Sequence, residues 1–557
     1  MSELDGVLVS RADIARYAGV KRPAVTNWER RHPDFPKPLT EPGKGPADTE
    51  VFAAAEVLSW LDARGVAANA RRSSEPEGTT YGDRFRAALG GPAAGALLKA
   101  VERLSGPEAE RFHGELSQTD YITVLLTLVY LRGCRPEDWR KILGEARRVR
   151  SGNPGTLLAR RLALAVREGP GPAHEQLLFA LVESLGDSRV VGIVLSLDDT
   201  GPVDRAEHAQ AFEVLLARYS DLVGRRAGDF FTPRAAVDVL TRLVSEESRD
   251  VQTVHDPFVR AGELLTSAYD AVAAAQGSPP RTSGAGVGEH PLALAAMNLA
   301  LHGVSDTALW AGNMTPSAWN DSQHQGFDRI MTNPPFNMRL DRLTERGNWR
   351  YGPPPQHNAN FAWLQYAVTS LAPGGRAAVL MPDIAAFSAN PSERRIRAAM
   401  VEDGAVEALI ALPPHLFATT GISVTVWLLR HPTGTCDEML VVDARHLGSM
   451  VSRSRRELSP HDTQRIVGEY RSWAAARVGG AGFTGTAGLS AVASIEQIRE
   501  MDFTLSPAFY VPGTATSEVS PVEAGDLAAL AGRLAVLHAR ARDADTVVDE
   551  LLGRYGL

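Results

Sequence analysis

Short apolar runs alternate with helical segments in the second half of the chain, from about Asp229 onward. The runs that suit buried strands include VQTVHDP, TALWAGN, FDRIMTNPPF, RAAVLMPD, AVEALIALP and ISVTVWLLR. Strands that alternate with helices predict an α/β fold, in which a mostly parallel sheet carries helices on both faces. Such sheets bind ligands at the carboxyl ends of their strands, so the residues that follow each run are the first candidates for a functional site.

The chain is long enough for several domains and has the composition of an ordinary globular protein. Its 557 residues predict three or four domains, and 44% apolar with 22% charged residues exclude a disordered or low-complexity chain. Two cysteines, Cys134 and Cys436, are too few for a disulfide framework or a structural zinc site, so we expect a reducing, cytoplasmic compartment and no metal. The first residues lack a signal-peptide pattern and no apolar run reaches about 18 residues, which argues against secretion and a membrane span.

A small winged helix-turn-helix domain is expected over residues 1–65. Residues 10–31 show an apolar helical stretch, then Gly19 as a turn residue, then a second short helix that carries Trp28. Between residues 11 and 37, seven Lys or Arg stand against three Asp or Glu, whereas the whole chain has a net charge of −8. The alternative to DNA binding is a helical adaptor that never touches DNA. The candidate DNA contacts are Arg22, Thr26, Asn27 and Arg30.

The pattern divides the rest of the chain into four segments. Residues 66–80 are rich in Ala, Ser, Pro and Gly without apolar periodicity, and are expected to be a linker. Residues 81–224 show helical patterns separated by Gly and Pro, which predicts an all-helical domain. Residues 225–452 hold the alternating runs, and residues 453–557 are expected to be helical again. The last helix carries an apolar stripe that suits a partner helix or its own domain, formed by Leu527, Leu530, Leu534 and Leu537.

The most specific local pattern is Asn333-Pro334-Pro335-Phe336, which directly follows the apolar run FDRIMT. The two prolines stiffen the loop, so the Asn333 amide and a backbone carbonyl can act as acceptors with little freedom to lose. An exocyclic amine such as adenine N6 is a poor nucleophile because its lone pair is delocalised, and two acceptors for its hydrogens favour the attacking geometry. The aromatic ring of Phe336 can stack on a base that has been flipped out of the duplex. These four residues are therefore the candidate catalytic residues.

From about residue 206 to 512 the chain resembles the N6-adenine DNA methyltransferases, most closely the modification subunit of type I restriction-modification systems. Residues 228–234, Gly-Asp-Phe-Phe-Thr-Pro-Arg, match the family's opening motif, which lies beside the methionine part of S-adenosylmethionine. This block precedes the cofactor loop and the catalytic motif, which is the family's gamma arrangement. The resemblance implies a Rossmann-like methyltransferase sheet with S-adenosylmethionine as its cofactor, and Phe231, Thr232 and Pro233 among the residues that bind it.

The departures from the family pattern fall on the cofactor side. The family's loop D-P-A-C-G-T-G corresponds here to residues 256–262, Asp-Pro-Phe-Val-Arg-Ala-Gly, so Arg260 replaces the first glycine. Glycine permits a positive φ and a close approach to the ligand, neither of which Arg260 supplies freely. The family's ribose-binding acid aligns with Gly286, and Glu289 reaches that place only if the alignment shifts by three residues. The cofactor-binding residues that the resemblance implies on this side are Asp256, Gly262, Glu289 and Asn313.

Two interpretations follow. The first is an active adenine methyltransferase with a divergent cofactor pocket, which serves a restriction-modification or phage-defence system. The second is a methyltransferase-like DNA-binding or regulatory protein whose degenerate cofactor loop no longer supports methyl transfer. Modification subunits of this family usually obtain target recognition from a separate specificity subunit, so the resemblance implies double-stranded DNA and a specificity subunit as partners. A homo-oligomer is left open.

Overall fold

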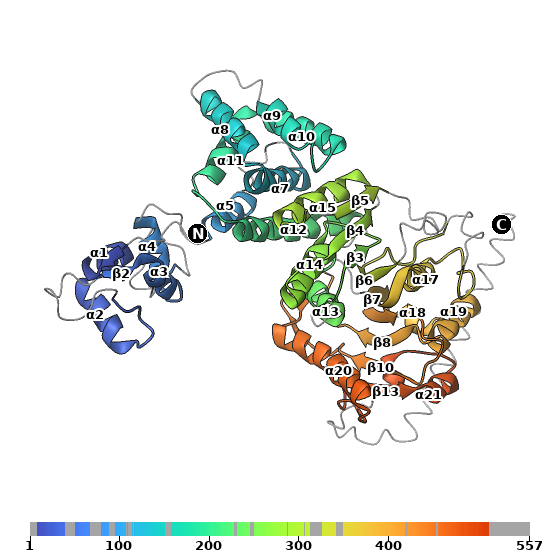
Figure 1. Ribbon diagram of the computed structural model, residues 1–557. Helices are drawn as coiled ribbons and strands as arrows, with labels where there is room; N and C mark the ends of the chain where they lie inside the picture. The colour runs from blue at the N-terminus through green and yellow to red at the C-terminus, as the bar shows by residue number, and fades with distance from the viewer. Residues whose placement is uncertain are drawn as a thin grey trace, which may run out of the picture.

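The computed structural model describes most of the chain in three parts (Figure 1). The described residues are 8–38, 51–66, 79–88, 95–106, 109, 114, 116–150, 158–227, 231–245, 250–286, 288–305, 307–311, 326–340, 349–417, 422–452 and 455–511. A small amino-terminal domain lies apart from an all-helical domain, and the helical domain packs on an α/β domain. The predicted terminal helix, with Leu527 to Leu537, lies outside the described residues.

The amino-terminal domain begins with two short helices joined by a turn. Helix α1 (Arg11–Ala18) begins with a capping box between Ser10 and Asp13, and ends at Gly19, whose φ of 66° is the left-handed conformation that glycine adopts readily. The chain then enters α2 (Arg22–Arg31). Strand β1 (Leu8–Ser10) pairs with β2 (Val51–Ala53), and α3 (Ala54–Asp62) directly follows β2.

The amino-terminal domain extends beyond the boundary expected at residue 65. The amide of Val66 donates to the Thr79 carbonyl, which returns the chain to the domain, and α4 (Tyr81–Ala88) follows. The ring of Phe85 is fully buried in the core that α1, α2 and α3 share, and it meets the ring of Tyr17 edge-on at 5.6 Å. We therefore place the end of this domain after α4.

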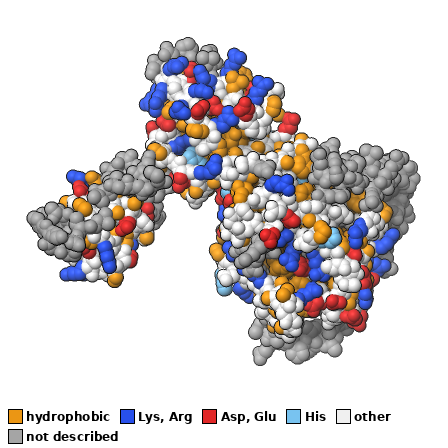
Figure 2. Space-filling model, in the orientation of Figure 1, with side chains coloured by type: hydrophobic (Ala, Val, Ile, Leu, Met, Phe, Trp, Pro, Cys, Tyr) orange, Lys and Arg blue, Asp and Glu red, His pale blue; other side chains and the backbone are white. Residues whose placement is uncertain are grey.

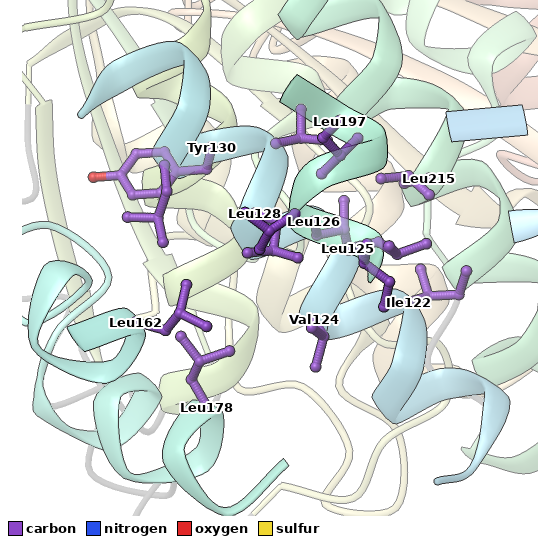
Figure 3. Packing of buried hydrophobic residues seen from close by; sticks show 14 of the residues in the cluster. Ile122, Val124, Leu125, Leu126, Leu128, Tyr130, Leu162, Leu178, Leu197 and Leu215 are labelled. Atoms are coloured by element: carbon purple, nitrogen blue, oxygen red, sulfur yellow. The ribbon is translucent and has the colours of Figure 1, made fainter. Parts of the chain in front are cut away.

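The helical domain is built around α7 (Gln118–Cys134), in which every side chain from Tyr121 to Leu131 is buried. Figure 3 shows leucines of α7 in contact with Leu162, Leu178, Leu197 and Leu215 from the surrounding helices. The same core includes Leu294 and Leu301 of the α/β domain, so the two domains share buried apolar surface. The other helices are α5 (Ala96–Ser105), α8 (Pro136–Arg150), α9 (Leu158–Ala165), α10 (Pro172–Leu185), α11 (Asp187–Asp198) and α12 (Arg205–Ala227).

In the described residues, nine strands form the central sheet of the α/β domain in the order β13-β10-β8-β9-β7-β6-β3-β4-β5. Neighbouring strands are parallel, except that β9 is antiparallel to both β7 and β8, and β13 is antiparallel to β10. The strands are β3 (Thr253–Asp256), β4 (Arg281–Gly286), β5 (Thr307–Ala311), β6 (Phe327–Thr332), β7 (Leu371–Pro382), β8 (Val406–Ala411), β9 (Val424–Arg430), β10 (Glu438–Asp443) and β13 (Ser490–Ser494).

Helices cover both faces of this sheet, which confirms the predicted α/β fold with a mostly parallel sheet. One core joins the sheet to α13 (Arg234–Val244), α14 (Glu263–Gln276) and α20 (Pro460–Gly479). A second core joins it to α17 (Asn360–Ser370), α19 (Pro391–Glu402) and α21 (Ile495–Glu500). Helix α15 (Glu289–Leu301) packs between the sheet and the helical domain.

The segment after residue 452 differs from the helical region that we expected. Helices α20 and α21 are present, but the chain between them returns as strand β13 to the edge of the central sheet. Short elements complete the described chain: α18 (Ile384–Phe387), the β11–β12 pair (Ser449–Met450 and Arg456–Glu457) and a 3-10 turn at Pro507–Phe509. Residues up to 511 therefore continue the α/β domain.

Candidate active site at the carboxyl edge of the sheet

Strands β3 and β6 lie side by side, and the chain leaves their carboxyl ends in the two segments that the sequence marks as functional. The order of the strands reverses between them, because β4 and β5 follow β3 on one side while β7 follows β6 on the other. Open α/β sheets bind ligands in the crevice at such a switch point. The cofactor loop after Asp256 and the catalytic loop after Thr332 are thereby brought to one place.

The carboxylate of Asp256 joins the two strand ends. Its Oδ1 accepts hydrogen bonds from the Thr332 hydroxyl at 2.8 Å and from the Phe258 amide at 3.0 Å, and the residue is only 3% exposed. Burial raises the pKa of Asp256 to about 7, although these two hydrogen bonds lower it. The predicted cofactor residue Asp256 thus holds the cofactor loop against the catalytic strand.

The catalytic loop is fixed from two sides. The Asn333 amide is buried and its Nδ2 donates to the Thr232 hydroxyl at 3.4 Å, while the Pro335 carbonyl accepts from the Trp363 indole at 3.1 Å. After Phe336, whose half-buried ring packs against the core, Asn337 takes a left-handed φ of 53°. Asn337 is held there by Asn360 at the start of α17.

Two hydrogen bonds form this clamp between Asn337 and Asn360. The Asn337 amide donates to Asn360 Oδ1, and Asn360 Nδ2 donates to Asn337 Oδ1, each at 3.0 Å. Asn360 is 1% exposed, whereas Asn337 is exposed, so the two bonds anchor the surface residue to a buried one. Helix α17 therefore packs beside the catalytic loop.

The Phe-Thr-Pro block lies between the two loops. Phe231 packs edge-on against Tyr219 of α12 at 5.6 Å, Thr232 contacts Asn333, and Pro233 is the N-cap residue of α13. The Thr232 backbone amide donates to Glu263 Oε1 at 3.0 Å, and the Ala261 amide donates to Glu263 Oε2 at 3.1 Å. One carboxylate therefore receives backbone N–H groups from the starts of two helices, α13 and α14.

Gly262 has the conformation that the family's glycine requires. Its φ is 76°, and a Cβ at this position would lie 3.3 Å from the Ala295 Cα. The Arg260 side chain in the same loop is half-buried. Gly286 ends β4 where the ribose-binding acid is expected, and a Cβ there would lie 3.1 Å from the Val259 carbonyl oxygen. A side chain at that position would have to displace the Leu292 side chain, whose Cδ2 would lie 2.8 Å from the added Cβ.

The other predicted cofactor residues lie at or beyond the limits of the site. Glu289 is exposed and is the first residue of α15, at the same edge of the sheet as Gly286. Asn313 lies outside the described residues.

Within the described part of the chain, no group of His, Cys, Asp and Glu is arranged to hold a metal ion, and no helix is both long and apolar enough to cross a membrane.

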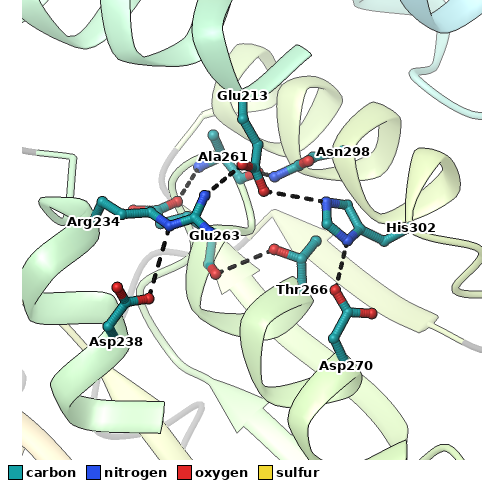
Figure 4. Close-up of polar contacts among 9 residues, drawn as sticks. All are labelled: Glu213, Arg234, Asp238, Ala261, Glu263, Thr266, Asp270, Asn298 and His302. Carbon is teal, nitrogen blue, oxygen red and sulfur yellow. Dashed lines mark hydrogen bonds and ion pairs between the residues drawn. The ribbon is translucent and has the colours of Figure 1, made fainter. Parts of the chain in front are cut away.

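A partly exposed ion-pair network around the mostly buried His302 connects the helical domain to this site (Figure 4). Glu213 of α12 pairs with Arg234 at 2.5 Å and with His302 at 3.6 Å, and His302 Nδ1 lies 2.8 Å from an Asp270 oxygen. Burial lowers the pKa of His302, but its contacts with Asp270 and Glu213 outweigh burial and raise that pKa to about 9. Together with Thr232, Ala261 and Glu263, these residues line a cavity of about 640 Å³.

Sequence reasoning missed Glu263 and the network around His302. Glu263 directly follows the predicted cofactor loop and is the first residue of α14. An acid at the first position of a helix is common, because it interacts favourably with the helix dipole. The sequence therefore did not show which donors its carboxylate contacts. The contacts of Glu213 and His302 join residues of α12, α13 and α14 with the C-cap residue of α15, and no local spacing predicts them.

The predicted DNA contacts are exposed on α2 of the amino-terminal domain. Arg22, Thr26 and Arg30 follow one another at a helical spacing of four residues, and Arg30 donates to the Asn27 side chain at 3.1 Å. Val25 on the opposite face is fully buried, and Trp28 packs against Trp60 at 5.6 Å between the ring centroids. Helix α2 thus has a polar outer face over an apolar inner face.

The sheet order and the Asn-Pro-Pro-Phe loop at its switch point define the class: a DNA methyltransferase. A model of the N-6 DNA Methylase family matches residues 204–519, and the chain belongs to that family. The adenine DNA methyltransferase function that the sequence predicts is thereby confirmed.

Named relatives agree with this assignment. The chain is 32% identical over 314 residues to the type I restriction enzyme HindI methylase subunit of Haemophilus influenzae, across 55% of this chain and 68% of the relative. It is 27% identical to the MjaIX methylase subunit of Methanocaldococcus jannaschii over about half of each chain, 54% in both cases.

Solved structures share the fold. The methyltransferase subunit of a type I restriction-modification system from Streptococcus thermophilus superimposes with a TM-score of 0.59 at 20% identity, over 75% of this chain and 98% of its own. A chain from a study of type I restriction-modification system assembly also has a TM-score of 0.59 at 17% identity, over 83% of this chain and 99% of its own.

The family implies S-adenosylmethionine as the methyl donor, and the residues at the methionine end fit it once one side chain moves. Gly262 lets the loop pack closely on Ala295, and the Thr232 and Ala261 amides converge as donors for one carboxylate. In this structure the carboxylate on those amides belongs to Glu263.

Proposed function

We propose that this chain is the modification subunit of a type I restriction-modification system, which methylates N6 of an adenine flipped out of double-stranded DNA. The observation that carries the proposal is the position of the Asn333–Phe336 loop at the switch point. There it contacts both the Phe-Thr-Pro block, through Thr232, and the cofactor strand, through the bond from Thr332 to Asp256.

The loop holds the target amine with two acceptors. Because Asn333 Nδ2 donates to Thr232, the acceptor that this amide offers a base is Oδ1. The Pro335 carbonyl already accepts from Trp363, so the second acceptor we assign is the Pro334 carbonyl. Both acceptors receive hydrogen bonds from the two N6 hydrogens and thereby direct the N6 lone pair toward the cofactor. The ring of Phe336 stacks on the base. S-adenosylmethionine supplies an electrophilic methyl group when it is bound.

We propose a specificity subunit as the partner that selects the DNA sequence. The relatives from Haemophilus influenzae and Methanocaldococcus jannaschii carry the names of methylase subunits of type I restriction enzymes, which supports assembly with further chains. A second copy of this chain in the assembly is left open. The amino-terminal domain, which we propose to be a winged helix-turn-helix, would add DNA contacts through Arg22, Thr26, Asn27 and Arg30.

Basic side chains on the helical domain support DNA binding. Figure 2 shows Lys and Arg side chains gathered over the upper part of this domain. Helix α8 contributes exposed cations to it, Arg140, Lys141, Arg147, Arg148 and Arg150. Phosphate contacts of this kind give affinity without sequence information.

Methyl transfer to DNA tests the proposal. The chain, assembled with its specificity subunit, is expected to transfer tritiated methyl from S-adenosylmethionine to adenine. Asn333→Ala removes an acceptor from the amine and should lower kcat by about 10²- to 10³-fold. Asn333→Asp keeps an acceptor of the same shape and should retain more activity. Calorimetry with S-adenosylhomocysteine controls for folding, and an Asn333→Ala variant as active as the wild type would overturn the assignment.

A further inference from the structure

We propose that Glu263 competes with the cofactor: in the free chain its carboxylate occupies the two backbone N–H groups that receive the methionine carboxylate of S-adenosylmethionine. This inference rests on the proposed function, since it concerns the same site. It makes Glu263 a residue that sets how tightly the cofactor binds, and its effect is specific to ligands that carry the amino acid group.

The argument begins with the donors. The Thr232 amide precedes α13 and the Ala261 amide precedes α14, and both point at the Glu263 carboxylate at 3.0 and 3.1 Å. Each donor lies one residue before an N-cap, Pro233 or Gly262, near the positive end of a helix dipole, so the two that converge favour an anion. Bonds from a carboxylate to backbone N–H groups are charge-assisted and stronger than neutral ones.

The position of these donors fits the chemistry of the cofactor. S-adenosylmethionine has one carboxylate, and a short aliphatic chain separates it from the sulfonium that carries the methyl group. The side chain of Thr232, whose amide is one of the two donors, bonds to the catalytic Asn333 at 3.4 Å. An anion on these amides therefore lies beside the catalytic loop, as the carboxylate must if the methyl group is to reach the amine.

The Glu263 side chain can move into an adjacent cavity when a ligand carboxylate takes its place on the two amides. The residue is half-buried and lines the cavity of about 640 Å³ between α12 and α14, together with Asn298 and Asp270. Asn298 is 1% exposed and donates through Nδ2 to the Ala261 carbonyl, so it holds the loop that carries one of the two donors. The Ala261 donor is therefore fixed independently of Glu263, and the contact of the Thr232 hydroxyl with Asn333 holds the segment that carries the second donor.

Calorimetric titration of the full-length chain with two ligands tests the inference. S-adenosylhomocysteine carries the amino acid group, and 5′-methylthioadenosine lacks it. Glu263→Gly removes the competing carboxylate and should raise the affinity for S-adenosylhomocysteine about tenfold, with no change for 5′-methylthioadenosine. Glu263→Gln, which keeps the shape without the charge, should give a smaller gain and provides a second variant if the glycine variant folds poorly.

Asp221→Asn is the matched control, because Asp221 lines the same cavity and is exposed on α12. It should leave both affinities unchanged. An equal gain for both ligands in Glu263→Gly, or the same gain in Asp221→Asn, would overturn the competition. Weaker binding of S-adenosylhomocysteine by Glu263→Gly would make Glu263 a ligand of the cofactor and also overturn it. Absence of binding by the wild type and every variant would instead refute the proposed function.

Discussion

The charge on His302 is expected to stabilise the contact between the helical and α/β domains in a pH-dependent way. His302 is buried between Glu213 and Asp270, which raise its pKa from 6.5 to about 9 in the folded protein. A raised pKa means that the folded state binds the proton more tightly. The stabilisation is therefore fully present below pH 6.5 and is lost as the pH rises through 9.

The magnitude follows from the two pKa values. A change from 6.5 to about 9 corresponds to about 3 kcal/mol, at 1.36 kcal/mol for each pH unit. The side chain of Asp270 is 54% exposed, and solvent screens its contribution, so about 1–2 kcal/mol is the expected net effect. In a unit of this size that lowers Tm by about 2–4 °C per kcal/mol.

Differential scanning calorimetry of wild type and His302→Gln at pH 6 and pH 9.5 measures this effect. The variant should unfold at a lower temperature than the wild type at pH 6, and the difference should largely disappear at pH 9.5. His461→Gln is the control, because His461 is exposed at the start of α20. If His302→Gln lowers Tm equally at both pH values, packing rather than charge accounts for its effect and the reasoning fails.

Three further predictions concern the catalytic loop and the DNA contacts. Asn360→Ala removes both bonds to Asn337 and should lower kcat for methyl transfer while calorimetry shows unchanged S-adenosylhomocysteine binding. Trp363→Phe leaves the Pro335 carbonyl without its indole donor, so stability measured by urea unfolding should fall by about 1–3 kcal/mol. Joint replacement of Arg22 and Arg30 by Ala should weaken DNA binding, and a gel-shift salt titration should show a slope shallower by about 2; an unchanged slope would exclude both arginines from phosphate contact.

Local patterns predicted the centre of the fold because the catalytic loop and its strand are adjacent in sequence. The apolar side chains Phe327, Ile330 and Met331 mark β6 as a buried strand, and two prolines follow shortly after its end. The edge of the sheet was not predictable in this way. Strand β13 has the sequence SAVAS, which is short and partly polar, and it pairs with β10 only after α20 has crossed between them.

Contacts between segments distant in sequence account for the other differences. Helix α4 joins the amino-terminal core because Val66 pairs with Thr79 across a segment whose composition suggested a linker. The sequence predicted that the Phe-Thr-Pro block and the cofactor loop contribute to one site, and in the structure an amide from each donates to Glu263. It gave no sign that Glu263 bonds to both, because hydrogen bonds to backbone amides leave no trace in residue identity.

These contacts couple the docking of the helical domain to the cofactor site. Glu213 of α12 pairs with Arg234, the first residue of α13, and the residues just before Arg234 are the Phe-Thr-Pro block. Phe231 in that block also packs on Tyr219 of α12. The block in turn supplies the Thr232 amide to Glu263 and the Thr232 hydroxyl to Asn333. Because one short segment makes all of these contacts, we expect a shift of α12 to displace the Thr232 backbone amide and the Asn333 side chain together.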